Sequence, residues 1–388
     1  MGREQYNMKI TRIEVIPLVR KLNQTFEGGT YRIVNRNTLV TRIYTDEGLV
    51  GEVFGGDEDI VQEKIVGLIQ DHFEPMLIGE DPRNIELLWN KMFFDGGKID
   101  LGNRSIHVLD LLNRGILMQA ISAIDMALWD LLGKIYNTPL YQLLGGYRKK
   151  VPVIAIGGYY QAGKGRSQLT DEMQHYKELG MTGVKFKVGR VTVAEDIKRV
   201  QAAREAAGDD FVIVCDANQG WTPDQAIQFC QEAVSLDLEW IEEPVRWYDQ
   251  LEGLRMVKDS SPIPVTAGQG EISGFGCRDL VLNGCVDNLN VDVTIAGGVT
   301  EWKRTANMAS LSHVQMAHHE EPQVALHLLA AVPNSLYVEI FPNYERDPMW
   351  IDLPIETYRI KDGFMELPNK PGLGMELNKD IIEKYRAI

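Results

Sequence analysis

Short apolar runs recur through the second half of the chain, and segments with helical periodicity separate them. Eight such runs precede residue 341: 151–156, 184–187, 211–215, 240–241, 264–267, 288–291, 314–316 and 336–340. Apolar runs of this length that alternate with helical segments are typical of parallel strands joined by helices. Eight successive βα units are what a closed (β/α)8 barrel requires, so the pattern predicts a TIM-like barrel.

The first half of the chain shows a different pattern. Three short β-type segments predict a small antiparallel sheet: 10–17, 37–44 and 49–54. Two polar segments, 21–32 and 55–58, are predicted to be loops that can serve as lids. From 59 to 137 apolar residues recur at three- and four-residue intervals, most clearly over 116–135, which predicts helices.

The chain breaks at Pro139 and at Gly145-Gly146, which indicates a domain boundary. At 388 residues the chain is also too long for one typical core. We therefore predict an α/β protein with an N-terminal α+β capping domain over residues 1–140 and a catalytic barrel over residues 141–351. Residues 352–388 are expected to pack back on the capping domain and to complete it.

Charge and cysteine content narrow the class of protein. The formal net charge of −15 argues against nucleic acid or an anionic membrane as a partner. No apolar run approaches the ~20 residues of a membrane-spanning helix, and the N-terminus lacks the apolar core of a signal peptide. The four cysteines form no CxxC pair, so we expect buried free thiols in a reducing cytoplasm.

Oxygen-bearing side chains follow three neighbouring strands of the predicted barrel. Asp216 follows the third strand, Glu242 the fourth, and Gln269 and Glu271 the fifth. The C-terminal ends of barrel strands converge on one mouth, where barrel enzymes carry out their chemistry. Hard oxygen ligands that leave room for water and substrate suit Mg²⁺. A structural ion pair is the alternative for each acid alone, and recurrence at successive strand ends favours the metal.

Two lysines end the second predicted strand. Lys185 and Lys187 point to the same face if they lie on a strand. Two ammonium groups side by side near a metal cation lower each other's pKa, and a lysine lowered toward neutrality can act as a general base. A solvated, charged strand end is the alternative.

A second candidate base follows the seventh strand. A carboxylate bonded to an imidazole fixes its tautomer and raises its basicity, and Asp292 after the sixth strand is placed to do this for His318 or His319. The histidines could instead bind metal or cap a helix. Glu339, at the end of the eighth strand, can transfer a proton or hold a substrate oxygen.

Taken together, these motifs resemble those of the enolase superfamily, and within it the mandelate racemase subgroup. The resemblance covers essentially the whole chain and is carried by the order and spacing of seven motifs: Lys185-Phe-Lys187, Asp216-Ala-Asn218, Ile241-Glu-Glu-Pro244, Asp292, Gly297-Gly-Val-Thr-Glu301, Met316-Ala-His-His319 and Tyr337-Val-Glu339. The resemblance implies that Mg²⁺ binds a substrate carboxylate while a base removes the proton from the adjacent carbon. It also implies a homo-oligomer.

Individual roles follow from the resemblance alone. It implies that Lys187 is one base, and that His319, paired with Asp292, is the other. It implies further that Lys185 contacts the substrate carboxylate, Asn218 hydrogen-bonds substrate near the metal, and Glu339 supports the enediolate oxygen.

The third metal ligand departs from the family pattern. The family carries a Glu at the position that aligns with Gln269, and an amide is a weaker Mg²⁺ ligand than a carboxylate. Glu271 would lie on the same side if the strand continued, so either residue can supply the ligand.

The polar loops and Tyr159, Tyr160 and Arg190 suit a polyhydroxylated acid better than an aromatic one. The sequence therefore predicts an acid-sugar dehydratase, a lyase that acts on a small carboxylate. A racemase or epimerase of a 2-hydroxy acid is the first alternative. The second alternative is a metal-binding scaffold that has lost its catalytic activity, in which case the replacement of Glu by Gln269 would be a sign of that loss.

Overall fold

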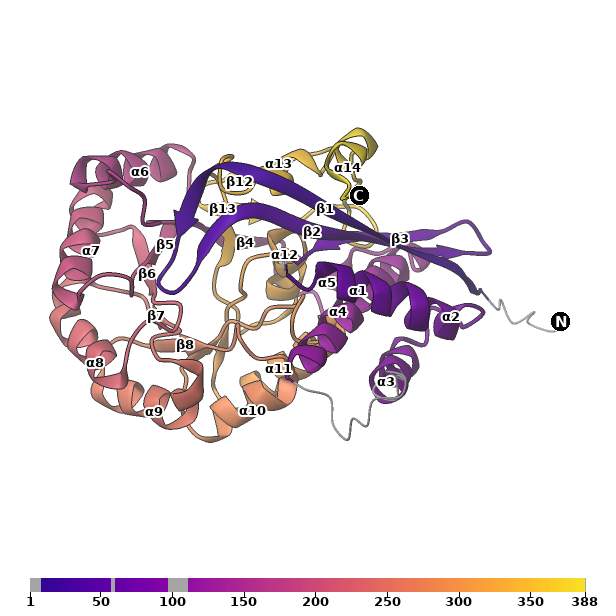
Figure 1. Cartoon of the computed structure of the whole chain (residues 1–388), viewed down its shortest axis with the longest axis horizontal. Coiled ribbons are helices and arrows are strands. Elements are labelled where there is room, and N and C mark those ends of the chain that lie inside the picture. Colours follow the sequence, from indigo (N-terminus) through magenta and orange to yellow (C-terminus); the bar gives the residue numbers. More distant parts are fainter. Residues whose placement is uncertain (1–7, 57–59, 97–110, 388) are drawn as a thin grey trace.

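The computed structural model describes residues 8–56, 60–96 and 111–387. It begins with an antiparallel sheet of three strands: β1 (Ile10–Glu27), β2 (Arg32–Thr45) and β3 (Val50–Gly55). Helices pack on one side of this sheet: α1 (Gln62–Leu68), η1 (Ile69–Phe73), α2 (Glu74–Leu77), α3 (Ile85–Gly96) and α4 (Leu111–Ile135). The short α5 (Leu140–Leu143) leads into the second half of the chain (Figure 1).

All eight predicted barrel strands are present in the second half. They are β4 (Lys150–Gly157), β5 (Gly183–Lys187), β6 (Val212–Asp216), β7 (Ile241–Glu242), β8 (Val265–Ala267), β9 (Asn288–Leu289), β10 (Gln315–Met316) and β11 (Val338–Ile340). Consecutive strands pair in parallel from β4 to β10, and β11 pairs in parallel with β4. At the remaining seam, a single parallel bridge joins Met316 of β10 to Ser335 just before β11. The predicted (β/α)8 architecture is therefore confirmed, with its last seam held by a bridge instead of a ladder.

Helices follow the strands and cover the outside of the barrel (Figure 1). They are α6 (Arg166–Glu178), α7 (Val193–Ala207), α8 (Pro223–Glu232), α9 (Gln250–Ser260), α10 (Gly274–Leu282), α11 (Gly298–Leu311) and α12 (Pro322–Ala331). The start of α8 is fixed by the Thr222 side chain, which caps the helix, and by Gln225, which closes the capping box.

The β1–β2 hairpin is much longer than the sequence indicates. Residues 21–32, predicted to be a loop, are mostly strand, and the hairpin arches over the barrel (Figure 1). A register shift between Lys21 and Phe26 breaks the two-residue periodicity of β1. Leu22 and Phe26 pack against Tyr159 in a small apolar cluster, which anchors the hairpin to the barrel.

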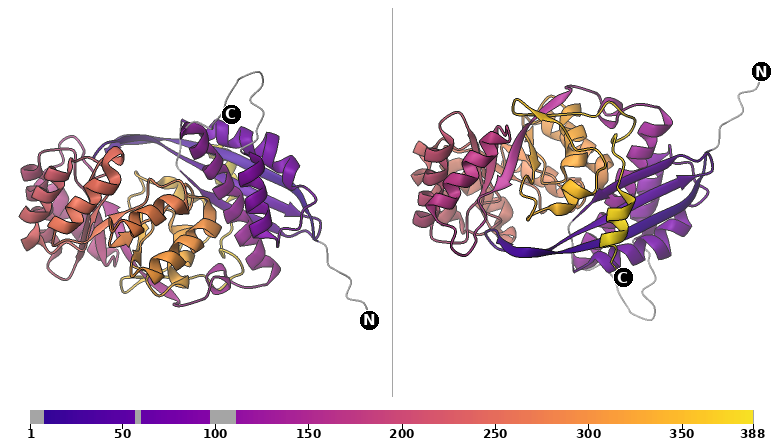
Figure 2. Two further views of the ribbon diagram at one scale, coloured as in Figure 1. Left: turned by 90° about the horizontal axis from the view of Figure 1, so that it is seen from below. Right: turned by 90° about the horizontal axis from the view of Figure 1, so that it is seen from above.

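The C-terminal segment contacts both halves of the molecule. It contains α13 (Pro348–Asp352), β12 (Ile360–Lys361), β13 (Phe364–Glu366) and α14 (Lys379–Tyr385). The β13 strand pairs with the start of β4, whereas Arg386 bridges to Leu18 of β1. In Figure 2 the last helix lies against the N-terminal sheet. The exact boundaries at residues 140 and 351 remain a prediction.

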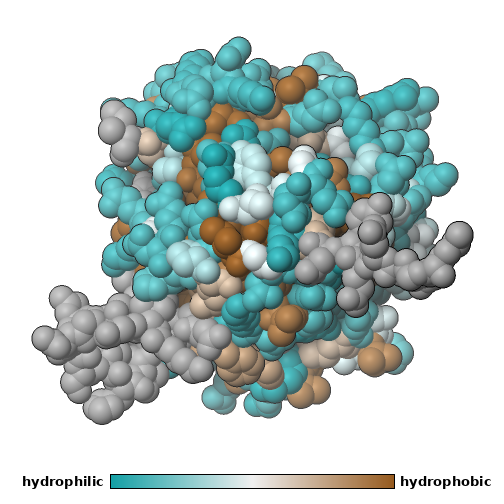
Figure 3. Space-filling model, turned by 90° about the vertical axis from the view of Figure 1, so that its right-hand side faces the viewer, coloured by the Kyte–Doolittle hydropathy of each residue, from teal (hydrophilic) through white to brown (hydrophobic). Residues whose placement is uncertain are grey.

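One helix corrects the expectation that no apolar run is long enough to cross a membrane. Residues Arg114–Ile135 of α4 are long and apolar enough to cross a membrane by length and composition alone. However, 78% of their apolar window is buried inside the protein. This helix packs against β3, β2 and α11, so burial in the core accounts for its composition. The face of the molecule drawn in Figure 3 is mostly polar, with apolar patches between polar side chains.

Candidate active site

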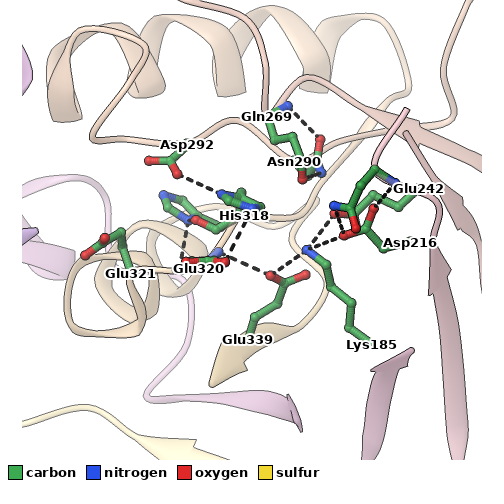
Figure 4. Close-up of polar contacts among 12 residues, drawn as sticks. Lys185, Asp216, Glu242, Gln269, Asn290, Asp292, His318, Glu320, Glu321 and Glu339 are labelled. Atoms are coloured by element: carbon green, nitrogen blue, oxygen red, sulfur yellow. Dashed lines mark hydrogen bonds and ion pairs between the residues drawn. The ribbon is translucent and has the colours of Figure 1, made fainter. Parts of the chain in front are cut away.

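Lys185 lies at the centre of a fully buried charge cluster inside the barrel. Its Nζ is 2.6 Å from Glu242 Oε1, 3.0 Å from Glu339 Oε2 and 3.7 Å from Asp216 Oδ2. Burial opposes the charge, but these three carboxylates outweigh it and raise the pKa of Lys185 well above its usual value. Figure 4 shows how one ammonium group spans carboxylates from three different strands.

Lys187 lies two residues further along β5, on the same face as Lys185, and its closest carboxylate is that of Asp216. Its Nζ donates to Asp216 Oδ2 at 2.6 Å, and it lies 5.6 Å from the ring centre of Tyr31 and 5.7 Å from that of Tyr159. Burial lowers the pKa of Lys187, but the charge of Asp216 outweighs burial and raises it. The expected low pKa is therefore not found, because Asp216 is close enough to overcome the repulsion from Lys185.

Asp216 is held by the turn that follows β6. Asn218 donates to it twice, from its backbone N–H at 2.8 Å and from its side chain at 2.9 Å. The tip of the hairpin then contacts Asn218, since Gly29 N–H donates to Asn218 Oδ1 and Thr30 Oγ1 donates to its carbonyl oxygen. The N-terminal hairpin thus closes one side of the barrel mouth.

His319 forms the predicted pair with Asp292. The distance between His319 Nδ1 and Asp292 Oδ2 is 2.8 Å, and Thr294 donates to the other carboxylate oxygen. Burial works against the imidazolium, but the charge of Glu320 and the hydrogen bond with Asp292 raise the pKa of His319 to about 9. A raised pKa favours the protonated form of His319 at neutral pH and suits it to donate a proton.

The other histidine of the pair has a structural role. His318 Nε2 accepts from Val293 N–H, so its Nδ1 carries the proton and donates to the carbonyl oxygens of His319 and Glu320. Burial lowers the pKa of His318 to about 4, so it stays neutral.

The two candidates for the third metal ligand point to different places. Gln269 lies at the barrel mouth, where its side-chain oxygen accepts from Asn290 Nδ2 at 3.3 Å (Figure 4). Glu271 accepts a hydrogen bond from Gln250 of α9 at 2.7 Å, and its carboxylate lies against Gly276 of α10. Strand β8 ends at Ala267, so the two-residue alternation that would align Glu271 with Gln269 no longer applies.

A divalent cation would therefore find two carboxylates and amide oxygens at this mouth. Asp216 and Glu242 are paired in register on neighbouring strands, with Gln269 following the next strand. Among the described residues, no three His, Cys, Asp or Glu side chains form a group that could hold a metal ion. Of the two candidates for the third ligand, Gln269 is the one that lines the cavity at this mouth.

A cavity of about 300 Å³ opens above these groups, at the lower end of the range for small-molecule pockets. Most of the residues that line it are polar, and they come from the hairpin and from four barrel loops: Thr30, Tyr31, Ile33, Asn218, Gln219, Gln269, His319, Glu320 and Arg346. Such a wall suits a small, hydroxylated ligand.

Some residues of the cavity wall could not be found from the sequence. Tyr31 lies in a segment predicted to be a loop, Arg346 follows the last barrel strand, and Glu320 follows the two histidines. The only feature of the sequence that points to these residues is their position in a predicted loop or shortly after a predicted strand. Arg190, in contrast, was predicted to line the mouth but pairs with Glu27 on the exposed side of the hairpin.

Other predicted lining residues also lie elsewhere. Tyr160 donates to Asp196 of α7, and Asn23 donates to Glu345 on the exposed surface. Asp57 and Glu58 lie outside the described residues. Of the predicted tyrosines, Tyr159 lies beside Lys187, and Arg346 donates to its hydroxyl oxygen.

Two family models match the chain. Residues 29–145 match the N-terminal domain of mandelate racemase / muconate lactonizing enzyme, and residues 168–381 match the enolase C-terminal domain-like family. Arabinonate dehydratase of Saccharolobus solfataricus is 30% identical over 90% of each chain. D-galactarolactone cycloisomerase of Agrobacterium fabrum is 31% identical over 98% of this chain and 99% of its own length.

Solved structures are similar over the whole fold. A mandelate racemase/muconate lactonizing enzyme from a marine actinobacterium, in complex with magnesium, has a TM-score of 0.88 and 42% identity, covering 98% of this chain and 100% of its own. L-talarate/galactarate dehydratase from Salmonella typhimurium, liganded with Mg and L-lyxarohydroxamate, has a TM-score of 0.88 and 26% identity, covering 100% of this chain and 95% of its own.

Proposed function

Since this chain belongs to the mandelate racemase / muconate lactonizing enzyme family of the enolase superfamily, we propose that it is a Mg²⁺-dependent acid-sugar dehydratase. The enzyme would remove the α-proton of a sugar acid and eliminate the β-hydroxyl as water. One observation carries this proposal. A lysine and a histidine, each paired with its own carboxylate, stand at the same mouth as the Asp216 and Glu242 oxygens.

The residues present fit a Mg²⁺ ion. Asp216 and Glu242 offer carboxylate oxygens and Gln269 an amide oxygen, which are the hard ligands that Mg²⁺ prefers. Asp216 and Glu242 are now balanced by lysine ammonium groups, so the cluster is already built to hold positive charge. When bound, Mg²⁺ would polarise the substrate carboxylate and so acidify the neighbouring C–H group.

Lys187 is the proposed base for the α-proton. Asp216 now keeps it protonated, so Lys187 can accept a proton only after another cation has taken up the charge of Asp216. Lys185, at the centre of the cluster, would contact the substrate carboxylate, and Asn218 would hydrogen-bond the substrate from the turn after β6. Among the described residues, Glu339 Oε1 is buried without a hydrogen-bond partner, so it can accept a bond from the enediolate oxygen once that oxygen is protonated.

His319 is the proposed acid. Its raised pKa supplies a proton at neutral pH, and Asp292 fixes the ring so that Nε2 is the nitrogen left for the substrate. A positioned acid or base typically accelerates proton transfer about 10²–10⁴-fold. A racemase remains the second candidate, because a lysine and a histidine at one mouth could also serve the two faces of the same carbon.

The test is a library of aldonates and aldarates incubated with the protein and Mg²⁺ in D2O. A dehydratase would form a 2-keto-3-deoxy acid, whereas a racemase would exchange the α-proton and invert the carbon without loss of water. If the protein carried out neither reaction with any member of the library, both activities would be refuted and the inactive scaffold would remain. With an active substrate in hand, Lys187→Ala should abolish exchange, and His319→Ala should abolish elimination but retain exchange.

We also propose a cytoplasmic homo-oligomer. The location is supported by four free cysteines, each of them buried, and the assembly by the family resemblance alone. Light scattering on the purified protein would test the assembly, since a monomer at micromolar concentration would contradict it.

A further inference from the structure

Glu320 occupies a constrained position beside the proposed acid. Its backbone has a φ of +50°, in the left-handed region that a non-glycine residue seldom adopts. Its N–H donates to Glu339 Oε2 at 3.2 Å, and its carbonyl oxygen accepts from His318 Nδ1 at 3.2 Å. The backbone is therefore fixed at both ends, and the side chain forms part of the cavity wall next to His319.

The Glu320 carboxylate stands between two cations without bonding directly to either. Its Oε1 is 3.7 Å from His319 Nε2 and 3.7 Å from Arg346 Nη2. Both distances exceed that of a hydrogen bond but permit ionic attraction. An oxygen atom that lies beside this pair can be within hydrogen-bonding distance of both Glu320 Oε1 and His319 Nε2.

Arg346 is one of the cations that keep Glu320 charged inside the protein. Its guanidinium lies on the ring of Phe341 at 4.4 Å and donates to Tyr159 Oη at 3.1 Å, which fix its orientation. Burial raises the pKa of Glu320, but the charges of His319, Arg346 and Arg36 outweigh burial and lower it. Glu320 is therefore an ionised acceptor at the cavity wall, and Figure 4 shows it between Asp292 and Glu339.

We infer that Glu320 and His319 together bind the hydroxyl group that leaves, an inference that rests on the proposed dehydration. The leaving oxygen would accept a hydrogen bond from His319 Nε2 and donate its own hydrogen to Glu320 Oε1. Lys187 takes the α-proton. The bond from the β-carbon to oxygen then breaks, the electron pair leaves with the oxygen, and that oxygen takes the Nε2 proton to become water. Glu320 stays ionised throughout, so protons balance without another reactant.

This arrangement favours elimination over racemisation. A carboxylate beside Nε2 stabilises the imidazolium form of His319, which suits an acid and hinders a base. A racemase would need the same nitrogen unprotonated in one direction of its reaction. Glu320 is thus a specificity-determining residue as well as a binding residue.

Glu320→Gln tests the inference, and Glu321→Gln is its matched control. Glu321 is the next residue, but it accepts from Gly56 N–H and faces Arg36 instead of the cavity. Burial raises the pKa of Glu321 to about 8, so a neutral side chain there changes little at pH 7. The substrate is the acid sugar that the wild-type protein converts fastest in the library, measured both for keto-acid formation and for α-proton exchange in D2O.

We expect Glu320→Gln to form keto acid about 10- to 100-fold more slowly, the effect of losing a hydrogen bond to a charged group. Exchange should persist, because Lys187 is untouched. A β-fluoro analogue should largely abolish the difference, since fluoride leaves without a proton. The imidazole of His319, followed by NMR, should titrate at lower pH in this variant. Glu320→Asp, which keeps the charge, should recover part of the rate and guards against a folding defect.

The outcomes separate the inference from the proposed function. If the wild-type protein formed keto acid from none of the substrates, the proposed dehydratase and this inference would both be overturned. Normal keto-acid formation by Glu320→Gln, in a protein whose wild type eliminates water, would overturn the inference alone. Equal loss of exchange and elimination, or an unchanged His319 titration, would do the same.

Discussion

Replacing Lys185 with methionine would leave three buried carboxylates without the cation that they share. The Lys185 side chain is fully buried, and it lies within 4 Å of Glu242, Glu339 and Asp216. Removing one partner of a buried ion pair typically costs about 3–5 kcal/mol of unfolding free energy, because the remaining charge is uncompensated. We expect a loss of this size for Lys185→Met in the metal-free protein.

The loss should depend on conditions in two ways. It should be smaller at pH 5 than at pH 8, because the carboxylates left behind can take up protons at the lower pH. Millimolar Mg²⁺ should restore much of it, since a cation that binds only the folded state stabilises that state by mass action. The Mg²⁺-induced stabilisation should therefore be larger for the variant than for the wild type.

Urea unfolding followed by tryptophan fluorescence, in EDTA and in Mg²⁺, measures both effects. Arg36→Met is the matched control, because it removes a buried cation from Asp347 at 2.9 Å, outside the charge cluster. That control should be destabilised equally in EDTA and in Mg²⁺. The electrostatic reasoning fails if Lys185→Met is as stable as wild type in EDTA, or if Mg²⁺ stabilises the variant and the wild type equally.

Three further predictions concern the metal and the response to pH. Asp216→Asn and Glu242→Gln should each abolish turnover, while circular dichroism shows that the fold is intact. Removal of Mg²⁺ with EDTA should also abolish turnover. A normal rate in either variant would place the metal elsewhere. Gln269→Ala should weaken Mg²⁺ binding in calorimetry more than Glu271→Gln does, and the reverse order would assign the ligand to Glu271. Burial lowers the pKa of His327 to about 4 from about 6.5 in the unfolded chain, so its contribution to stability is complete above pH 6.5 and is lost as the pH falls toward 4. At about 1.4 kcal/mol for each pH unit of separation, that loss approaches about 3 kcal/mol, and the unfolding free energy of His327→Gln should fall less steeply over this range.

Much of the barrel could be predicted because its signals are local. Each strand is a short apolar run, and three neighbouring strands end at a charged residue that the strand itself carries to the mouth. Asp216 and Glu242 are the last residues of β6 and β7, and Lys187 is the last residue of β5. Neighbouring strands in register then bring such residues together without any further information.

The hairpin over the mouth could not be predicted in this way. Its outer half contains few apolar residues, and the register shift between Lys21 and Phe26 removes the alternation that identifies a strand. The Glu320–Arg346 pair was also missed. These charges lie on separate loops, and in a sequence a charged loop residue is more often solvated than buried.

The position of Gln269 depends on strain in the turns around it. Five non-glycine residues with positive φ lie in the turns after β6, β7 and β10: Asn218, Gln219, Glu243, Glu320 and Glu321. Such backbone persists only where the surroundings hold it, and here one turn holds the next. Gln219 N–H donates to the carbonyl oxygen of Glu243, whose carboxylate accepts from the N–H groups of Gly268 and Gln269. The third position of the proposed metal site therefore depends on Glu243 as much as on Gln269 itself.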